Sequence, residues 1–323
     1  MSIDSLSIVV PVYNSEKSLP VLLERLAELL PTLVDQFEVI LVNDASRDGS
    51  ATVIERAAEE RTWVIGIELM RNFGQHNALL AGIRNARFQT IVTMDDDLQN
   101  PPSEVKRLVE HARATGKDVV YTRYAVKQHA YWRNLGSRFA NWVADVLMEK
   151  PKGLYLSSFR CMSAFLVEQV TRYEGPFPYV DGLIMQATQA IDTIEVAHLP
   201  RASGRSNYTM KRLVRLWLNI FVNFSVMPLH LSTIAGFALS LIGLIGVVSV
   251  VLEALFFEPP QGWASLMAAT LLLSGVQLLI LGILGEYMGR LFLTANRKPQ
   301  TVVREVVRSE TTARVGVRVV ERA

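Results

Sequence analysis

The first 120 residues alternate short apolar runs with stretches of helical periodicity, about five times. The apolar runs predict strands at Leu6–Val12, Phe37–Val42, Val64–Leu69, Thr90–Met94 and Asp118–Tyr121. Between the first two runs, leucines recur at helical spacing from Leu19 to Leu30, and Ser15 or Asn14 could cap this helix. Similar helical segments follow the next three runs. Strands that alternate with helices in this way predict an α/β fold with a mostly parallel sheet covered on both faces.

Polar residues follow the predicted strands, at Asn14, Asp44, Arg71 and Asp95–Asp97. Ligands of open parallel sheets bind at the carboxyl ends of the strands, so these residues predict one shared cleft. The first strand runs into PVYNSE, without the G-x-G-x-x-G of a dinucleotide fold, and no G-x-x-x-x-G-K-[ST] loop occurs. A diphosphate in this cleft would therefore need another source of positive charge, such as a metal ion.

The segment Ile91–Pro102, IVTMDDDLQNPP, places three adjacent carboxylates at the end of the fourth strand. Like charges this close repel strongly, which indicates a divalent cation or a polar ligand among them. The alternative is an acidic turn that caps the next helix. In an extended segment Asp95 and Asp97 point to one side and can share a cation. Asp96 should point away, and its loss should be the mildest of the three.

Four segments, VVPVYNSEKSLP, VNDASRDGS, RNFGQHNALLAG and DDDLQNPP, carry a resemblance to a known family. In this order and spacing they resemble glycosyltransferase family 2, which has the GT-A fold, a Rossmann-like α/β architecture. More narrowly, the chain is similar to the polyprenyl-phosphate glycosyltransferases of that family over about residues 5–290. That group includes dolichyl-phosphate mannose synthases and undecaprenyl-phosphate glucosyl and aminoarabinose transferases.

The resemblance implies roles for residues at the strand ends. Pro11, Tyr13 and Asp44 would line the nucleoside pocket, and Asp44 would accept a hydrogen bond from the base. Asp95 and Asp97 match the family's D-x-D, which holds Mg²⁺ or Mn²⁺ against the sugar diphosphate, with Gln99 beside them. One departure is Asn43, because the family commonly has two acidic residues where this chain has Asn43-Asp44.

A basic segment, PRASGRSNY, follows the region of regular alternation and contains Arg201 and Arg205. By itself it could be a solvated basic loop. The resemblance implies that the acceptor phosphate approaches here, so Arg201 and Arg205 are candidate phosphate-binding residues, with Arg133 as a third. The planar guanidinium suits this role because it can bond two phosphate oxygens at once.

The last third of the sequence is markedly apolar. Residues 209–226 predict an amphipathic helix in the membrane interface, with bases on one side and aromatics on the other. Leu231–Leu252 and Trp263–Gly285 carry no charge and are each long enough to span a bilayer. Bases precede the first span and follow the second, which predicts that both ends are cytoplasmic. Two buried core helices are the alternative.

The predicted organisation is a GT-A domain at 1–208, an interface helix at 209–227, a transmembrane hairpin at 228–289 and a tail at 290–323. The start of the sequence shows no signal-peptide pattern. The single cysteine, Cys161, excludes an intramolecular disulfide and is predicted to be a buried small apolar residue. His76 is predicted to be a structural polar group.

The resemblance implies a metal-dependent, inverting enzyme on the cytoplasmic face of the bacterial inner membrane. It would move a sugar from a nucleotide sugar, expected to be a UDP-sugar, to undecaprenyl phosphate, for cell-envelope glycan or lipid A modification. The expected partners are these substrates, the bilayer and further copies in a homo-oligomer, expected to be a tetramer, with no nucleic acid. Two alternatives remain: a processive family-2 polysaccharide synthase, or a non-catalytic membrane protein that binds nucleotide sugars. The first needs further spans and a Q-x-x-R-W motif, which the sequence lacks.

Overall fold

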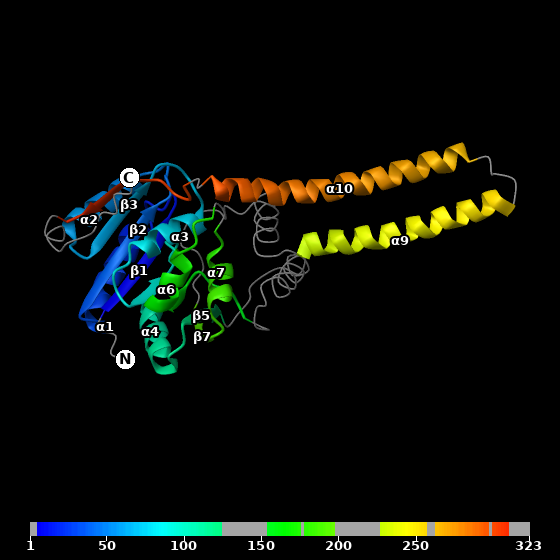
Figure 1. Cartoon of the computed structure of the whole chain (residues 1–323). Coiled ribbons are helices and arrows are strands. Elements are labelled where there is room, and N and C mark those ends of the chain that lie inside the picture. The colour runs from blue at the N-terminus through cyan, green and yellow to red at the C-terminus, as the bar shows by residue number, and fades with distance from the viewer. Residues whose placement is uncertain are drawn as a thin grey trace. The chain divides into compact units, whose positions relative to one another are not determined.

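The computed structural model describes residues 5–124, 154–175, 178–197, 227–256, 262–296 and 299–309 (Figure 1). These residues fall into two compact units. One contains a sheet and the helices packed on it, and the other contains two long helices.

The first unit is built on one mixed sheet with the strand order β7-β5-β6-β4-β1-β2-β3-β8. Its strands are β1 (Ser5–Val12), β2 (Gln36–Asn43), β3 (Val64–Leu69), β4 (Thr90–Thr93), β5 (Val119–Tyr124), β6 (Arg160–Ser163), β7 (Ile191–Val196) and β8 (Val303–Arg308). Strands β4, β1, β2 and β3 pair in parallel, as do β5 and β7. Strand β6 lies antiparallel between β4 and β5, and β8 is antiparallel to β3.

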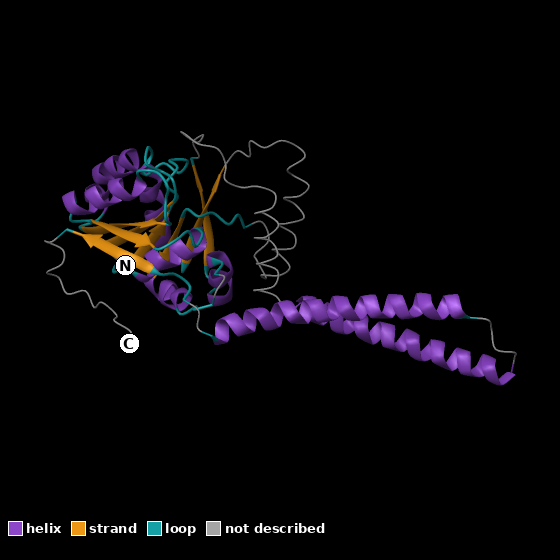
Figure 2. Ribbon diagram, turned by 90° about the horizontal axis from the view of Figure 1, so that it is seen from above, coloured by secondary structure: helices purple, strands orange, loops and turns teal. Residues whose placement is uncertain are grey.

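Helices cover both faces of this sheet (Figures 1 and 2). They are α1 (Leu19–Leu33), α2 (Ser50–Glu60), α3 (Gln75–Arg84), α4 (Ser103–Thr115), α6 (Ala164–Thr171) and α7 (Val180–Ala187). Alternate residues of β1 point to opposite faces of the sheet. Ile8 and Val10 pack in the apolar cluster to which α1, α2 and α4 also contribute side chains. Val9 faces α3 instead, where a Cβ at Gly82 would lie only 2.4 Å from the Val9 Cγ1 atom. Glycine at this position therefore lets α3 lie close to the sheet.

The five predicted strands are confirmed, and so is the mostly parallel α/β class. Strands β6, β7 and β8 were not predicted from the sequence pattern. The first helix begins at Leu19, later than the expected cap at Asn14 or Ser15. The residue that precedes this helix is Ser18, and the Ser15 hydroxyl donates to Asp96.

The second unit consists of α9 (Met227–Phe256) and α10 (Trp263–Ala295), which run in opposite directions and contact each other (Figures 1 and 2). Within the described residues, Leu273–Ala295 of α10 is the one stretch long and apolar enough to cross a membrane. The apolar stretch Ser232–Gly246 in α9 is shorter. Two transmembrane helices, as predicted, are therefore not confirmed.

The interface helix expected at 209–226 lies outside the described residues. From the expected tail, residues 303–308 form β8 and pair with β3, so this segment is an edge strand of the sheet.

Candidate active site

Three neighbouring parallel strands, β4, β1 and β2, end at the same edge of the sheet. The segments that follow them carry the predicted residues: Tyr13 after β1, Asp44 after β2, and Asp95, Asp97 and Gln99 after β4. Pro11 lies buried within β1, in register with Val42 of β2. The structure therefore brings these six predicted residues to one region, as the sheet topology requires.

Asp44 is buried, and its carboxylate is bonded to the loop that precedes α3. The backbone N–H of Phe73 donates to Oδ1 at 2.6 Å, and that of Gly74 donates to Oδ2 at 2.9 Å. Gly74 has a φ of 93°, in the region that favours glycine. Burial raises the pKa of Asp44, while the two amides act in the opposite direction. Asp44 therefore fixes the conformation of this loop, whatever it also offers to a ligand.

Asn43, the departure from the family pattern, has a structural role. Its Nδ2 donates to Glu68 Oε2 at 2.6 Å, and its Oδ1 accepts from the Ser46 backbone N–H at 3.0 Å. The amide thus bridges β3 and the turn after β2. A carboxylate at this position would meet the Glu68 carboxylate instead of bonding to it.

Asp95 accepts hydrogen bonds on both carboxylate oxygens. Gln75, the first residue of α3, donates through Nε2 to Oδ1 at 2.8 Å. The Ser158 hydroxyl donates to Oδ2 at 2.5 Å, from a segment 63 residues further along the chain. Neither donor was predicted, because sequence spacing carries no information on contacts of this range.

Asp96 and Asp97 have different partners from Asp95. Asp96 accepts from the backbone N–H of Tyr13 at 3.3 Å and from the Ser15 hydroxyl, so it faces the turn after β1. Burial raises the pKa of Asp96 to about 6, with contributions from the charges of Asp95 and Asp97. Asp97 Oδ1 accepts from the Gln99 backbone N–H at 3.1 Å. These contacts agree with the expectation that Asp96 points away from the side shared by Asp95 and Asp97. That loss of Asp96 has the mildest effect of the three stays a prediction.

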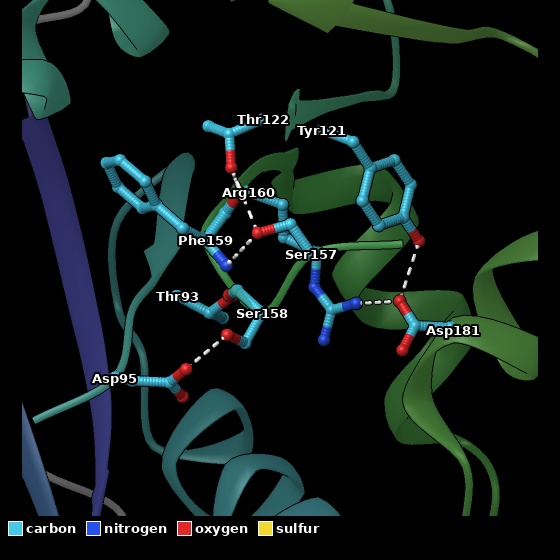
Figure 3. A network of polar contacts seen from close by, with 9 residues as sticks. All are labelled: Thr93, Asp95, Tyr121, Thr122, Ser157, Ser158, Phe159, Arg160 and Asp181. Carbon is cyan, nitrogen blue, oxygen red and sulfur yellow. Dashed lines mark hydrogen bonds and ion pairs between the residues drawn. The ribbon is translucent and has the colours of Figure 1, made fainter. Parts of the chain in front are cut away.

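The segment Ser157–Arg160 connects Asp95 to a buried ion pair (Figure 3). Arg160 is 1% exposed and bonds to Asp181 of α7 through its Nη1. The Tyr121 hydroxyl donates to the same carboxylate oxygen at 3.0 Å. Sequence reasoning missed this network. The one available signal was an arginine inside the apolar run FRCM.

The donor set at Asp95 and Asp97 fits a hard divalent cation. Carboxylate oxygens are the ligands that Mg²⁺ and Mn²⁺ prefer, and Mg²⁺ is commonly bound by one or two carboxylates together with substrate phosphates. No group of three or more His, Cys, Asp or Glu side chains is gathered as a metal site in the part of the chain that the structure describes. A cation here would therefore complete its coordination with phosphate oxygens and water.

The remaining predicted residues have separate outcomes. Arg133, Arg201 and Arg205 lie outside the described residues. Cys161 is buried in β6, and burial raises its pKa to about 12, which confirms a structural cysteine. The ring of His76 packs edge-on against Tyr179 with centroids 4.9 Å apart, and burial lowers its pKa to about 4. His76 is therefore a neutral packing residue near neutral pH.

Comparison with known proteins gives consistent matches. Residues 7–169 match the sequence profile of Glycosyl transferase family 2. The chain is 36% identical over 321 residues to the undecaprenyl-phosphate 4-deoxy-4-formamido-L-arabinose transferase of Pseudomonas aeruginosa, covering 96% of this chain and 93% of that protein. The protein of the same name from Aeromonas hydrophila is 34% identical over 314 residues, with 95% of each chain covered.

A solved structure shares the fold. The glucosyl-3-phosphoglycerate synthase of Mycobacterium tuberculosis, crystallised with Mn²⁺, UDP-glucose and phosphoglyceric acid, aligns with a TM-score of 0.51 and 17% identity. The alignment covers 68% of this chain and 78% of that one. At this identity the similarity supports the α/β architecture alone.

Proposed function

The chain belongs to glycosyl transferase family 2, and from this premise we propose that it transfers a sugar from a nucleotide sugar to undecaprenyl phosphate. Relatives whose names state this activity match almost the whole chain, including the region of the two long helices. The observation that carries the proposal is the presentation of Asp95 and Asp97 at the end of β4, beside the loop fixed by Asp44. The biological role that follows is modification of lipid A or another envelope glycan.

The donor is a UDP-sugar in this proposal, and UDP-4-deoxy-4-formamido-L-arabinose is the first to test because the named relatives transfer that sugar. Pro11, Tyr13 and Asp44 line the nucleoside side of the cleft, and Asp95 and Asp97 hold Mg²⁺ or Mn²⁺, with Gln99 beside them. A bound cation supplies positive charge against the leaving diphosphate. The segment Gly175–Gln189, which includes α7, is the proposed sugar-contacting region.

The chemistry is a single displacement with inversion. A phosphate oxygen of the lipid attacks the anomeric carbon, the new carbon–oxygen bond forms, and the bond to the diphosphate breaks with the electron pair leaving on the nucleoside diphosphate. A phosphate monoester has a second pKa of about 6 and is largely a dianion near neutral pH, so no strong base is required. Arg201 and Arg205, with Arg133 as a third candidate, bind the acceptor phosphate and position it against charge repulsion.

The membrane part of the proposal is a hairpin in which α9 and α10 both cross the inner membrane, with residues 209–226 in the cytoplasmic interface. Its support is the absence of charge from Leu231–Leu252 and Trp263–Gly285 and the bases that flank them. A cysteine introduced at Gln261 should then react with an impermeant reagent supplied to the periplasm. Protection of this cysteine there, together with labelling from the cytoplasmic side, would contradict the topology.

Transfer of radiolabelled sugar to undecaprenyl phosphate by the purified full-length chain tests the activity, with product mass to identify the sugar. One sugar per lipid is expected, whereas a ladder of products would indicate a processive synthase, and donor binding without any product would indicate a non-catalytic binding protein. Arg201→Ala should raise KM for the lipid about 10-fold or more and leave nucleotide binding unchanged. Unchanged lipid kinetics would remove Arg201 from the acceptor site. Sedimentation of the same sample tests the proposed homo-oligomer, with a tetramer expected.

A further inference from the structure

The carboxylate of Asp95 is held by two neutral donors from distant parts of the chain. Gln75 bonds to Oδ1 at 2.8 Å and Ser158 to Oδ2 at 2.5 Å. The second distance falls in the range of about 2.5–2.7 Å that marks a strong hydroxyl–carboxylate bond. We infer that Gln75 and Ser158 are positioning residues that fix the plane of the Asp95 carboxylate in an orientation suited to a divalent cation. This inference rests on the proposed function.

The placement of Ser158 depends on β4, the strand that carries Asp95. The hydroxyl of Thr93, buried in β4, donates to the Ser158 carbonyl oxygen at 2.6 Å (Figure 3). Ser158 is therefore bonded through its backbone to Thr93 and through its side chain to Asp95. Two bonds to residues so close in the chain leave Ser158 little freedom to rotate away from Asp95.

The residues on either side of Ser158 are fixed to the neighbouring elements. The Thr122 hydroxyl of β5 donates to the Phe159 carbonyl oxygen at 2.7 Å, and the Ser157 hydroxyl accepts from the Phe159 backbone N–H at 3.1 Å. Arg160 then pairs with Asp181 (Figure 3). These contacts are buried, so they give the segment the rigidity that a precisely oriented hydroxyl requires.

The placement of Gln75 depends on the neighbouring strand end. Gln75 follows Gly74, whose backbone N–H is bonded to the buried Asp44. Asp44 therefore fixes the start of α3, and α3 in turn delivers an amide to Asp95. The orientation of the proposed metal ligand is in this way linked to the carboxyl end of β2.

The chemical nature of the two donors suits this role. A hydroxyl and a carboxamide hold a carboxylate without cancelling its charge, whereas Lys or Arg would compete with a cation for it. Outer residues that orient metal ligands typically change metal affinity by about 10–100-fold when they are removed. That magnitude sets the expected effect.

The experiment measures Mn²⁺ affinity of the purified full-length chain in detergent, by the electron paramagnetic resonance signal of free Mn²⁺, without donor or acceptor. Ser158→Ala should weaken binding about 10–100-fold, and Ser158→Thr, which keeps the hydroxyl, should restore it. Gln75→Ala is the second variant, and because this side chain is exposed its loss does not threaten folding. It should also weaken binding.

Ser163→Ala is the matched control, since it removes another hydroxyl five residues from Ser158. The Ser163 hydroxyl accepts from the Leu166 backbone N–H at 3.3 Å as the N-cap of α6. Its loss should lower the unfolding temperature and leave Mn²⁺ affinity unchanged. A general loss of stability is thereby separated from a loss of orientation at Asp95.

The outcomes distinguish a failure of the positioning role from a failure of the metal site. If wild type binds Mn²⁺, Asp97→Ala does not, and Ser158→Ala and Gln75→Ala both bind as wild type, the positioning inference is overturned and the metal site stands. If wild type and Asp97→Ala bind alike, the metal site itself is wrong and the inference falls with it.

Discussion

Two carboxylates at neighbouring strand ends, Asp44 after β2 and Asp95 after β4, are held in opposite ways. Asp44 is 3% exposed, and backbone amides of one loop occupy both of its oxygens. Asp95 is half-buried, and side chains from two distant segments hold it. Asp44 is therefore bonded to the backbone of one loop, whereas Asp95 is oriented by side chains.

This difference separates a carboxylate whose contacts shape a loop from one whose contacts orient the carboxylate itself. A carboxylate bonded to backbone amides shapes a loop, and its removal leaves part-buried donors without this acceptor. A carboxylate held by side chains in a half-exposed position is expected to add little to folding. Loss of the first type should reduce stability, and loss of the second type should reduce activity.

The largest effect is expected from Asp97→Ala. It removes one of the two proposed cation ligands, so sugar transfer should fall at least about 10³-fold at any Mn²⁺ concentration. Because Asp97 is half-buried, we expect the free energy of unfolding of the Asp97→Ala protein to differ from that of wild type by no more than about 0.5 kcal/mol. Initial rates of lipid glycosylation and a thermal unfolding curve on the same preparation provide the measurement. Residual transfer that rises to the wild-type rate at high Mn²⁺ would show that Asp97 is not a necessary ligand.

Asp44→Ala should differ from Asp97→Ala by a large loss of stability. The part-buried amides of Phe73 and Gly74 lose their acceptor, and because one fully buried unpaired donor costs about 1–3 kcal/mol, we expect a loss of about 2–3 kcal/mol for the two together. Asp44→Asn is the matched control, since its carbonyl oxygen can still accept one of the two bonds, and it should fall between wild type and Asp44→Ala. Denaturant unfolding monitored by circular dichroism measures all three. Equal stability of the three proteins would contradict an architectural role for Asp44.

The comparison also explains how far the sequence could predict the fold. The strands β1 to β5 follow from local apolar runs, which depend only on neighbouring residues. Strand β6 has four residues and is placed by pairing with β4 and β5, so its stability is entirely tertiary. Strand β8 lies in a segment of alternating Val and charged residues, and its structure depends on the free edge of β3.

The site could be predicted to the same extent and for the same reason. The cluster after β4 and Asp44 after β2 follow from the rule that parallel strands present their carboxyl ends at one edge. Ser158 and Arg160 could not be found in this way, because their partners Asp95 and Asp181 are 63 and 21 residues away. Ser15 was assigned to a helix cap, although the tertiary structure uses its hydroxyl on Asp96. The local sequence therefore locates the proposed metal ligands, whereas the residues that orient them depend on contacts between distant parts of the chain.

The smallest expected effect comes from Asn43→Asp, which restores the second acidic residue common in the family. In wild type the Asn43 amide donates to Glu68 at 2.6 Å, and burial already raises the pKa of Glu68. The substitution removes this donor and adds a like charge, so the folded pair should keep a proton to higher pH than the unfolded chain does.

This binding of a proton fixes the sign of the pH dependence. The folded variant binds more protons than the unfolded chain, so its stability falls as pH rises. Below about pH 4, where both carboxyls are protonated in the unfolded chain, the variant should approach wild type. Above the raised pKa it should be less stable by about 1–2 kcal/mol, the equivalent of roughly one pKa unit. Adding Glu68→Gln returns a donor to the pair and should bring the pH profile back to that of wild type. A loss of stability independent of pH in Asn43→Asp would mean that the charge of Glu68 is not the partner that requires asparagine at this strand end.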